Sequence, residues 1–543
     1  MRPLLLSLLL LLPTILAAQT TPTEQNMNFA RQLHILNRVL ANLDMYYVDT
    51  LDIKKVVDQG LQYMLYNLDP YTQYIPEEES EEFLEQKSGT YAGIGSPIGF
   101  HAEQNRCFFS NPYEGMPAAE AGVRSGDVII AVDGENLQRN EGEAPADYSS
   151  RVTSKLRGEA GTSFKLTLQR PGVEGNLVLT LTRRVIERSN VLYSGMLTDS
   201  VGIIIVSSFM ENTTRDVRRA FVALKQQGMQ RLVLDLRDNP GGLVAEAVSL
   251  VGLFMPNGTK VVTTKGKVAE FEEAFATDDE PLDAKIPLIV LVNEGSASAS
   301  EITAGALQDY DRALVLGTRT YGKGLVQQSI DLPYGGILKY TSSKYYIPSG
   351  RCIQAYDFKN RGEDGRPHHL PDSLAKTFYT ASGRPVKDGG GVTPDSILQP
   401  DTVATFVYEL LTSQVTQDFA AFYCNTHPAP AMQEWSITDT IFAAYKQYIA
   451  ASTFKYNPRS LRMLDSLAEV LKWEQVEATA AVENLRKHLQ PDLATEIDRH
   501  KAAITDHLEF LLAANYYGIT PSYAFKLRKD SVVKQAVVLS REE

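Results

Sequence analysis

The chain has 543 residues, of which 43% are hydrophobic and 22% are charged, and these are the proportions of ordinary soluble globular proteins. This composition excludes a mainly disordered chain, a collagen-like chain and a polytopic membrane protein. The 53 Lys and Arg residues against 66 Asp and Glu residues give a formal net charge of −13. An acidic chain binds the nucleic-acid backbone poorly, so we expect no nucleic-acid partner. The length predicts three or four domains.

Three cysteines, Cys107, Cys352 and Cys424, lie far apart in the sequence. Their spacing matches no zinc site and no dense disulfide framework. They allow one disulfide at most, and we do not predict that one.

The first 18 residues have the pattern of a secretory signal peptide: a positive charge at Arg2, the leucine-rich run Leu4–Leu12, and small residues at Ala17 and Ala18. The alternative is an N-terminal membrane anchor. However, the apolar stretch is only about 15 residues long, and about 20 are needed to span a bilayer. No cysteine lies near the cleavage region to carry a lipid. We therefore expect cleavage near Ala18 and an exported protein in the periplasm or at the cell envelope.

Residues 19–88 form a predicted N-terminal helical segment. Apolar residues recur near helical spacing from Gln25 to about Tyr66. Pro70 ends this block because it disfavours helical backbone at Asp69. The acidic run Glu77–Glu82 that follows indicates a solvated helix face.

Residues 89–187 are predicted to form a β-rich domain. The sequence predicts a short loop at Gly93-Ile94-Gly95, a short helix at Ala118–Gly122 and a polar loop at Glu141–Asp147. The predicted strands are Gly126–Gly134, Phe164–Leu168 and Leu177–Leu181.

Residues 188–400 alternate strands and helices, which predicts an α/β core with a sheet flanked by helices. The predicted strands are Val201–Val206, Leu232–Leu236, Leu288–Val292 and Leu314–Leu316, and the predicted helices are Thr214–Gln227, Val244–Phe254 and Ser300–Tyr310. Residues 350–400 are rich in Gly, Pro and charge and predict long loops with short strands. Residues 401–543 predict a C-terminal helical region with long periodic stretches at Leu461–Leu489 and Leu493–Tyr516.

A serine-rich segment, Asn293-Glu294-Gly295-Ser296-Ala297-Ser298-Ala299-Ser300-Glu301-Ile302, lies where a predicted strand passes into a helix. A hydroxyl at a helix start is exposed, and the helix N-terminus favours developing negative charge. The alternative is structural, because Ser298 to Glu301 fit the S-x-x-E capping box, and a capping serine needs no chemistry.

No histidine lies between His101 and His368, so the α/β core contains none to serve as a base. A lysine can replace histidine in Ser-Lys sites, and Lys323 is the candidate, with a glycine on each side. If its segment is a strand, Lys323, Leu325 and Gln327 point to one face, and Gln327 could orient the amine. Lowering a lysine pKa from about 10.4 to roughly 7.5 costs about 4 kcal/mol and requires apolar burial. The alternative is a surface lysine beside a turn.

A third segment, Asp235-Leu236-Arg237-Asp238-Asn239-Pro240-Gly241-Gly242, follows a predicted strand. Backbone N–H groups of Gly241 or Gly242 could donate to an oxyanion together with the N–H of Ala299. The alternative is an ordinary Asn-Pro-Gly-Gly turn.

Together, these three segments resemble the carboxyl-terminal processing proteases, the tail-specific serine peptidases of family S41. In that family an N-P-G-G loop precedes a G-S-A-S-A-S-E serine segment, and a T-[YF]-G-K-G-x-V-Q segment follows. The family lysine comes 25 residues after the nucleophile, so the resemblance selects Ser298 and Lys323, rejects Ser296 and Ser300, and places the family glutamine at Gln327. Further landmarks are Leu68-Asp69-Pro70, Gly89–Gly95 and Gly390–Asp395.

The resemblance implies a PDZ domain at residues 89–187, whose loop Tyr91-Ala92-Gly93-Ile94-Gly95 would bind the terminal carboxylate of a substrate tail. It implies polypeptide substrates, an acyl-enzyme formed on Ser298, and no metal or cofactor. An adaptor or activator protein and a homo-oligomer stay open. Two alternatives also stay open, a non-catalytic peptide-binding or scaffold protein on the same fold and a hydrolase of small esters or amides.

Overall fold

The computed structural model describes residues 22–187, 189–363 and 365–541. The predicted signal peptide therefore lies outside the described residues. The chain divides into two compact units, Met1–Glu77 with Ser329–Tyr340, and Glu78–Gln328 with Thr341–Glu543. The boundaries at 88, 187 and 400 stay predictions.

In the first unit, two helices and one short strand follow each other: α1 (Pro22–Tyr46), α2 (Ile53–Tyr66) and β1 (Gln73–Ile75). Asp52 caps α2 by accepting the Lys55 N–H at 3.1 Å. After α2 the chain turns at Asp69, whose carboxylate accepts the N–H of Thr72 at 2.8 Å. Strand β1 pairs antiparallel with the first residues of β18 (Ile337–Tyr346). No helix within the described ranges is long and apolar enough to cross a membrane.

A six-stranded sheet forms the centre of the second unit. Its order is β10-β11-β12-β15-β16-β23, with β10 antiparallel to β11 and the other pairs parallel. The strands are β10 (Val191–Met196), β11 (Val201–Val206), β12 (Arg231–Asp235), β15 (Leu288–Val292), β16 (Leu314–Gly317) and β23 (Ser396–Ile397). All four strands predicted from the sequence are confirmed. Because parallel strands end at one edge, the loops after β12 and β15 come together there.

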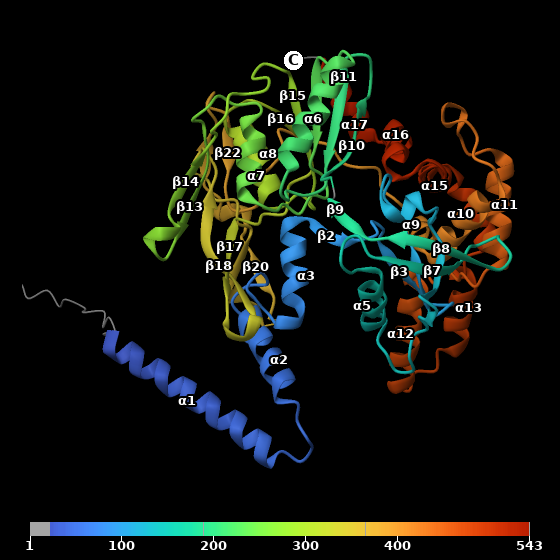
Figure 1. Ribbon diagram of the computed structural model, residues 1–543, viewed down its shortest axis with the longest axis horizontal. Coiled ribbons are helices and arrows are strands. Elements are labelled where there is room, and N and C mark those ends of the chain that lie inside the picture. The colour runs from blue at the N-terminus through green and yellow to red at the C-terminus, as the bar shows by residue number, and fades with distance from the viewer. Residues whose placement is uncertain (1–21, 188, 364, 542–543) are drawn as a thin grey trace, which may run out of the picture. The chain divides into compact units, whose positions relative to one another are not determined.

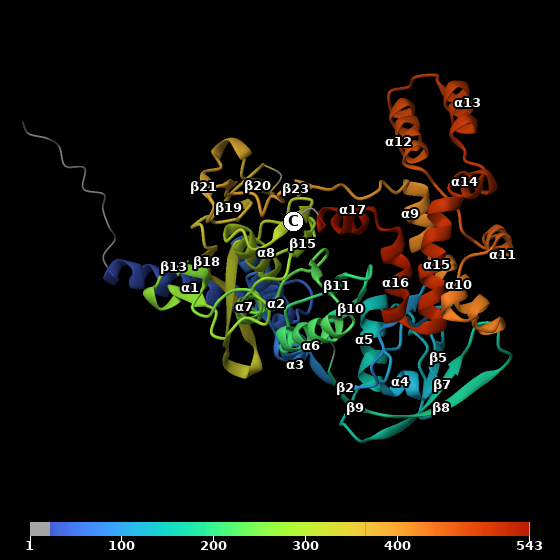
Figure 2. The same cartoon turned by 90° about the horizontal axis from the view of Figure 1, so that it is seen from above.

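One face of this sheet is covered by the three predicted helices, α6 (Thr213–Gln226), α7 (Val244–Gly252) and α8 (Ala299–Asp309) (Figure 1). Alternate strand residues such as Ile204, Leu234 and Val290 are buried in that cluster. The opposite face is covered by the last helices of the chain, α16 (Ile519–Lys529) and α17 (Ser531–Leu539) (Figure 2). The C-terminal end of the chain thus completes the core of the central sheet.

A second sheet lies at the end of the core that holds Lys323. It contains β13 (Lys260–Gly266), β14 (Glu273–Ala276), β17 (Leu325–Asp331) and β18. Residues 350–400 form long loops and short strands, as predicted: β19 (Tyr356–Arg361), β20 (Pro367–His369), β21 (Thr377–Tyr379) and β22 (Pro385–Lys387).

The predicted PDZ segment folds around a β-sheet of order β3-β4-β5-β7-β8, with β6 (Glu135–Asn136) added to β5. Helix α3 (Glu77–Ser88) precedes it, and β2 (Thr90–Gly93) pairs with β9 (Arg184–Glu187). The sheet strands are β3 (Ile98–His101), β4 (Arg106–Phe109), β5 (Val128–Val132), β7 (Ser163–Gln169) and β8 (Asn176–Thr182), and the helices are α4 (Pro117–Glu120) and α5 (Pro145–Leu156). The predicted polar loop Glu141–Asp147 is wrong at its end, because Pro145 starts α5 as a first-turn proline.

The two long periodic stretches predicted near the C-terminus are each interrupted. Gln475, with φ of 57°, separates α12 from α13, and His500 separates α14 from α15. The helices of this region are α9 (Thr405–Thr412), α10 (Gln414–Thr426), α11 (Asp439–Ala451), α12 (Arg459–Trp473), α13 (Thr479–Leu489), α14 (Leu493–Arg499) and α15 (Lys501–Tyr517). Helix α10 contacts the PDZ segment, where His101 Nε2 lies 3.0 Å from the Asp418 carboxylate.

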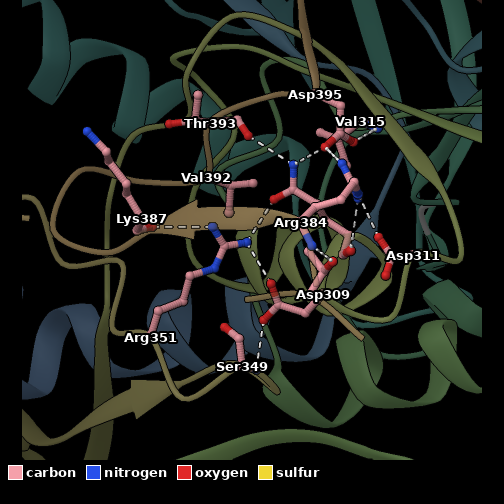
Figure 3. Close-up of polar contacts among 12 residues, drawn as sticks. Asp309, Asp311, Val315, Ser349, Arg351, Arg384, Lys387, Val392, Thr393 and Asp395 are labelled. Carbon is pink, nitrogen blue, oxygen red and sulfur yellow. Dashed lines mark hydrogen bonds and ion pairs between the residues drawn. The ribbon is translucent and has the colours of Figure 1, made fainter. Parts of the chain in front are cut away.

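A buried polar network fixes the C-terminal end of α8 (Figure 3). Arg351 and Asp309 are both about 1% exposed, and their side chains pair at 2.8 Å. Asp395 accepts the N–H of Val315 at 2.8 Å and pairs with Arg384 at 2.6 Å. These bonds join α8, β16 and the 380–395 loop, so the network holds α8 at the end opposite Ser298.

Candidate active site

Ser298 occupies a strained turn between β15 and α8. Its backbone angles are φ 54° and ψ −113°, a conformation that side-chain-bearing residues rarely adopt. Such strain costs about 1–3 kcal/mol, persists only where the surroundings impose it, and clusters at functional sites. The same strand-turn-helix arrangement presents the nucleophile in α/β-hydrolases. Ser298 and Glu301 form the S-x-x-E capping box, and among the described residues the Ser298 hydroxyl donates no hydrogen bond.

The hydroxyls of the two neighbouring serines are both hydrogen-bonded to backbone carbonyls. The Ser296 hydroxyl donates to the carbonyl of Leu236 at 2.7 Å, and the Ser300 hydroxyl donates to the carbonyl of Asn239 at 2.9 Å. Both side chains are fully buried. The geometry therefore distinguishes Ser298 from the two serines beside it.

Glu301 joins the serine turn to the lysine segment. Its Oε2 accepts the backbone N–H of Ser298 at 2.8 Å and that of Lys323 at 2.9 Å. The two nitrogens thus cannot be further apart than the sum of these distances. Its Oε1 accepts the N–H of Gly322 at 2.7 Å and the Thr320 hydroxyl at 2.5 Å. Burial raises the pKa of Glu301 to about 7, although these four hydrogen bonds oppose the rise.

Close packing by another backbone segment holds Lys323, as its flanking glycines predict. A Cβ on Gly322 would lie 2.4 Å from the Cβ of Ala355, and a Cβ on Gly324 would lie 2.7 Å from the N of Gln354. Lys323 itself is half-buried, and Leu325 beside it is buried. The segment is not a strand at Lys323, because β17 begins at Leu325. The alternation argument that aligned Lys323 with Gln327 therefore does not apply.

Two further side chains lie close to these segments. The side-chain amide of Gln327 donates to the Thr341 hydroxyl at 3.2 Å, and its role toward the lysine amine stays a prediction. The buried Tyr345 of β18 donates its hydroxyl to the carbonyl of Ser298 at 3.2 Å, and its own N–H donates to the carbonyl of Gly324. Tyr345 thus connects the serine turn and the lysine segment from a third element.

The Asn239–Gly242 loop lies directly against the serine turn. The carbonyl of Asn239 accepts the N–H of Ala297 at 3.0 Å. The N–H of Gly241 already donates to the Asn239 side chain at 2.9 Å, so Gly241 is not an available oxyanion donor in this arrangement. In the described part of the chain, the N–H groups of Gly242 and Ala299 make no hydrogen bond. Of the three predicted oxyanion donors, Gly242 and Ala299 are therefore the two whose N–H groups could bind an oxyanion.

The predicted carboxylate-binding loop is shorter than the sequence suggested. Tyr91, Ala92 and Gly93 lie in β2 and pair with β9, and only Ile94 and Gly95 lie beyond the strand. Local sequence could not predict this, because the partner strand is about 90 residues away. The carbonyls of Ile94 and Gly95 accept the N–H groups of Ala118 and Tyr113. Their own N–H groups have no bond within the described ranges, which is what an incoming carboxylate requires.

Comparison with known proteins identifies the family. The pattern described as peptidase family S41 matches residues 200–360, that of a PDZ domain matches residues 108–170, and that of the C-terminal helical domain of PDZ-proteases matches residues 406–539. A carboxy-terminal-processing protease of Bartonella bacilliformis is 34% identical over 344 residues, which cover 63% of this chain and 76% of that protein. The chain belongs to peptidase family S41.

Further proteins resemble this chain. A CtpA-like serine protease of Staphylococcus aureus is 35% identical over 331 residues, which cover 60% of this chain and 64% of that relative. Among solved structures, a photosystem II D1 C-terminal processing protease matches with 28% identity and a TM-score of 0.34, covering 68% of this chain and 93% of that one. The predicted fold class, an α/β peptidase core with a PDZ domain and helical terminal segments, is confirmed.

In this S41 peptidase, sequence reasoning missed two residues of the site. Glu301 was recognised only as a capping-box member, although it accepts hydrogen bonds from both motif segments. The S-x-x-E spacing predicts its bond to Ser298 but not its bond to Lys323. Tyr345 lies 47 residues from Ser298 and carries no local signal.

Proposed function

We propose that this chain is an exported serine endopeptidase that recognises C-terminal tails of polypeptides through its PDZ domain and cuts them with a Ser298–Lys323 dyad. The observation that carries the proposal is the convergence of the Ser298 and Lys323 backbone N–H groups on one oxygen of Glu301. A side chain that fixes both motif segments at once supports a shared chemical task. The strained backbone at Ser298, at the start of α8, supports its role as the nucleophile.

The proposed reaction is acyl transfer. Neutral Lys323 takes the proton of the Ser298 hydroxyl as the oxygen attacks the peptide carbonyl. The N–H groups of Gly242 and Ala299 stabilise the oxyanion. Lys323 then gives its proton to the leaving amine, and the acyl-enzyme is hydrolysed when Lys323 removes a proton from the attacking water.

The tail-binding step rests on the PDZ domain. Strand β3 pairs with β4 on one side only, so its other edge can accept a peptide as an added strand. The N–H groups of Ile94 and Gly95 would meet the terminal carboxylate at the start of that edge. The peptide side chains would give specificity.

Export is proposed from the leucine-rich run Leu4–Leu12 and the small residues Ala17 and Ala18. Fractionation of cells that produce the full chain tests it. A mature N-terminus near Gln19 in the periplasmic or envelope fraction supports export, and an intact N-terminus in the cytoplasm contradicts it.

Cleavage of an unstructured protein such as casein tests the catalytic proposal. Ser298→Ala and Lys323→Ala should each abolish cleavage and prevent labelling by a serine-reactive probe. Ser300→Ala is the matched control, because the carbonyl that loses its hydroxyl donor still accepts the N–H of Ala297. Labelling that persists in Ser298→Ala would contradict the assignment of the nucleophile.

Two outcomes would favour the alternatives. A chain that binds tailed peptides but neither cuts nor labels would be a peptide-binding protein. A chain that turns over small esters but no polypeptide, tailed or untailed, would be a small-molecule hydrolase.

A further inference from the structure

An ion pair joins the C-terminal helical region to Arg237, the residue before the loop that carries the proposed oxyanion donor Gly242. Arg237 Nη1 lies 2.9 Å from Asp530 Oδ2, and both side chains are largely buried, at 19% and 14% exposed. Arg237 directly precedes the Asp238–Gly242 loop, and Asp530 lies between α16 and α17. The pair therefore joins segments almost 300 residues apart in sequence.

Asp530 is held firmly on its own side. Its Oδ1 accepts the N–H of Val533 at 3.0 Å and so caps α17. Val532, Val533 and Ala536 of that helix are buried against the central sheet, among residues such as Ile203 and Leu291. One carboxylate oxygen thus fixes the helix, and the other contacts the peptidase loop.

Arg237 is equally constrained on the other side. Its guanidinium pairs with Asp235 at 2.6 Å, at the end of β12. The next residue, Asp238, has φ of 58°, and its N–H donates to the side chain of Asn293 at 2.8 Å. The Asn293 amide donates back to the Asp238 carboxylate at 2.9 Å. Arg237 and Asp238 are therefore the two residues in the path of contacts that leads from Asp530 to Asn293 in the serine segment.

The loop also has room to move. A cavity of about 290 Å³ is lined by Arg237, Asp238, Asn293 and Asp530, among others. Loss of the ion pair would leave Arg237 bound to Asp235 and Asp238 bound to Asn293. The loop would then lose the contact that Asp530 makes across this cavity. The last residues of β11 and β15 and residues of α16 also line this cavity, and Figure 2 shows α16 and α17 beside the central sheet.

We propose that Asp530 is a positioning residue of the peptidase site, which through Arg237 holds the Asp238–Gly242 loop in the place where the N–H of Gly242 can stabilise the oxyanion. The inference rests on the proposed function of that loop. It assigns the C-terminal helical domain a part in transition-state stabilisation. Because the effect is on a transition-state contact, it should lower kcat and leave KM unchanged.

The test compares Asp530→Asn and Asp530→Ser with the wild-type chain on a chromogenic peptide. Asn and Ser are both good N-caps, so both variants can keep α17 capped while they lose the carboxylate that pairs with Arg237. We expect kcat to fall about tenfold or more with KM within twofold, and Asp530→Glu to recover most of kcat. The matched control is Asp492→Asn, since Asp492 caps α14 in the same domain by accepting the Thr495 N–H at 2.8 Å. The control should keep wild-type kinetics.

The outcomes separate this inference from the proposed function. Turnover by the wild type that does not depend on Ser298 would contradict the proposed function. Ser298-dependent turnover with the same kcat in both charge-removing variants as in the wild type would overturn the role of Asp530. A rise in KM alone, or a loss of kcat that Asp530→Glu does not recover, would also overturn it. If Asp530→Asn fails to fold, Asp530→Ser supplies the same comparison, and failure of both to fold would show that the pair serves stability.

Discussion

Gly241 leaves no room for a side chain against Ser298: a methyl group on Gly241 would lie 2.8 Å from the Cβ of Ser298 and 2.6 Å from the carbonyl oxygen of Ala297. Gly241 also has φ of 95°, which favours glycine. The close approach brings the glycine loop against the serine turn. The distance between the glycine loop and the serine turn decides whether the N–H groups of Gly242 and Ala299 can bind the same oxyanion.

Gly241→Ala should therefore lower kcat/KM by about 100-fold or more, the usual size of a lost oxyanion contact. The side chain would push the two loops apart. Gly258→Ala is the matched control, because Gly258 has a comparable φ of 78° and open space around its Cβ position. Peptide hydrolysis by the two variants is the measurement. Equal activity in both would contradict the proposed contact.

Replacing Ser298 by glycine should give a more stable protein than replacing it by alanine, and both changes should abolish cleavage. Glycine adopts positive φ without strain, so Ser298→Gly should raise the free energy of unfolding by about 1 kcal/mol relative to Ser298→Ala, which keeps the strain. Denaturant unfolding of the two inactive variants is the measurement. Equal stability would mean that the turn is not strained.

Glu301→Gln should lower kcat strongly, because two carboxylate oxygens receive four donors and an amide offers only one acceptor oxygen. We expect kcat to fall about 100-fold, because the loss of these hydrogen bonds would displace Ser298 and Lys323 together. Glu294→Gln in the same serine segment is the control, since Glu294 is exposed and its hydrogen bond from the Thr318 hydroxyl is one that an amide oxygen can also accept. Retained activity in Glu301→Gln would show that catalysis does not need this carboxylate.

The raised pKa of Glu301 also predicts how stability depends on pH. The carboxyl titrates near 4.5 when the chain is unfolded and near 7 when it is folded. The folded state holds the proton more tightly, so this contribution is full below about pH 4.5 and is lost as the pH rises through about 7. The loss amounts to roughly 3 kcal/mol. Unfolding of wild type and Glu301→Gln between pH 4.5 and 8 measures it, and parallel stability curves would contradict it.

Gly95→Ala should prevent tail docking without affecting the chemical step. Gly95 has φ of 71°, and a Cβ there would lie 2.4 Å from the Cβ of Met116. Binding of a tailed peptide should weaken at least tenfold, while serine-probe labelling stays near the wild-type level. Gly115→Ala, in the same domain with φ of 70° and open space, should bind normally. Equal binding by both variants would place the carboxylate site elsewhere.

Much of the core was predictable because its signals are local. The strands of the central sheet are short apolar runs, as at Leu288–Val292, and the helices on one face have clear ends. Predictions failed where a distant segment decided the structure. Strand β2 forms because β9 pairs with it. The long C-terminal stretches break at Gln475 and His500, where the apolar periodicity gives no warning.

The sequence by itself predicted the order of the domains and, through its resemblance to the family, the pair Ser298 and Lys323, because motif order and a 25-residue spacing are properties of the chain. Only the tertiary structure decided what holds the pair. Glu301 receives N–H groups from both segments, Gly241 has its N–H already occupied, and Asp530 contacts the loop from the far end of the chain. Hydrogen bonds and ion pairs between segments depend on three-dimensional distance, and no local periodicity encodes that distance.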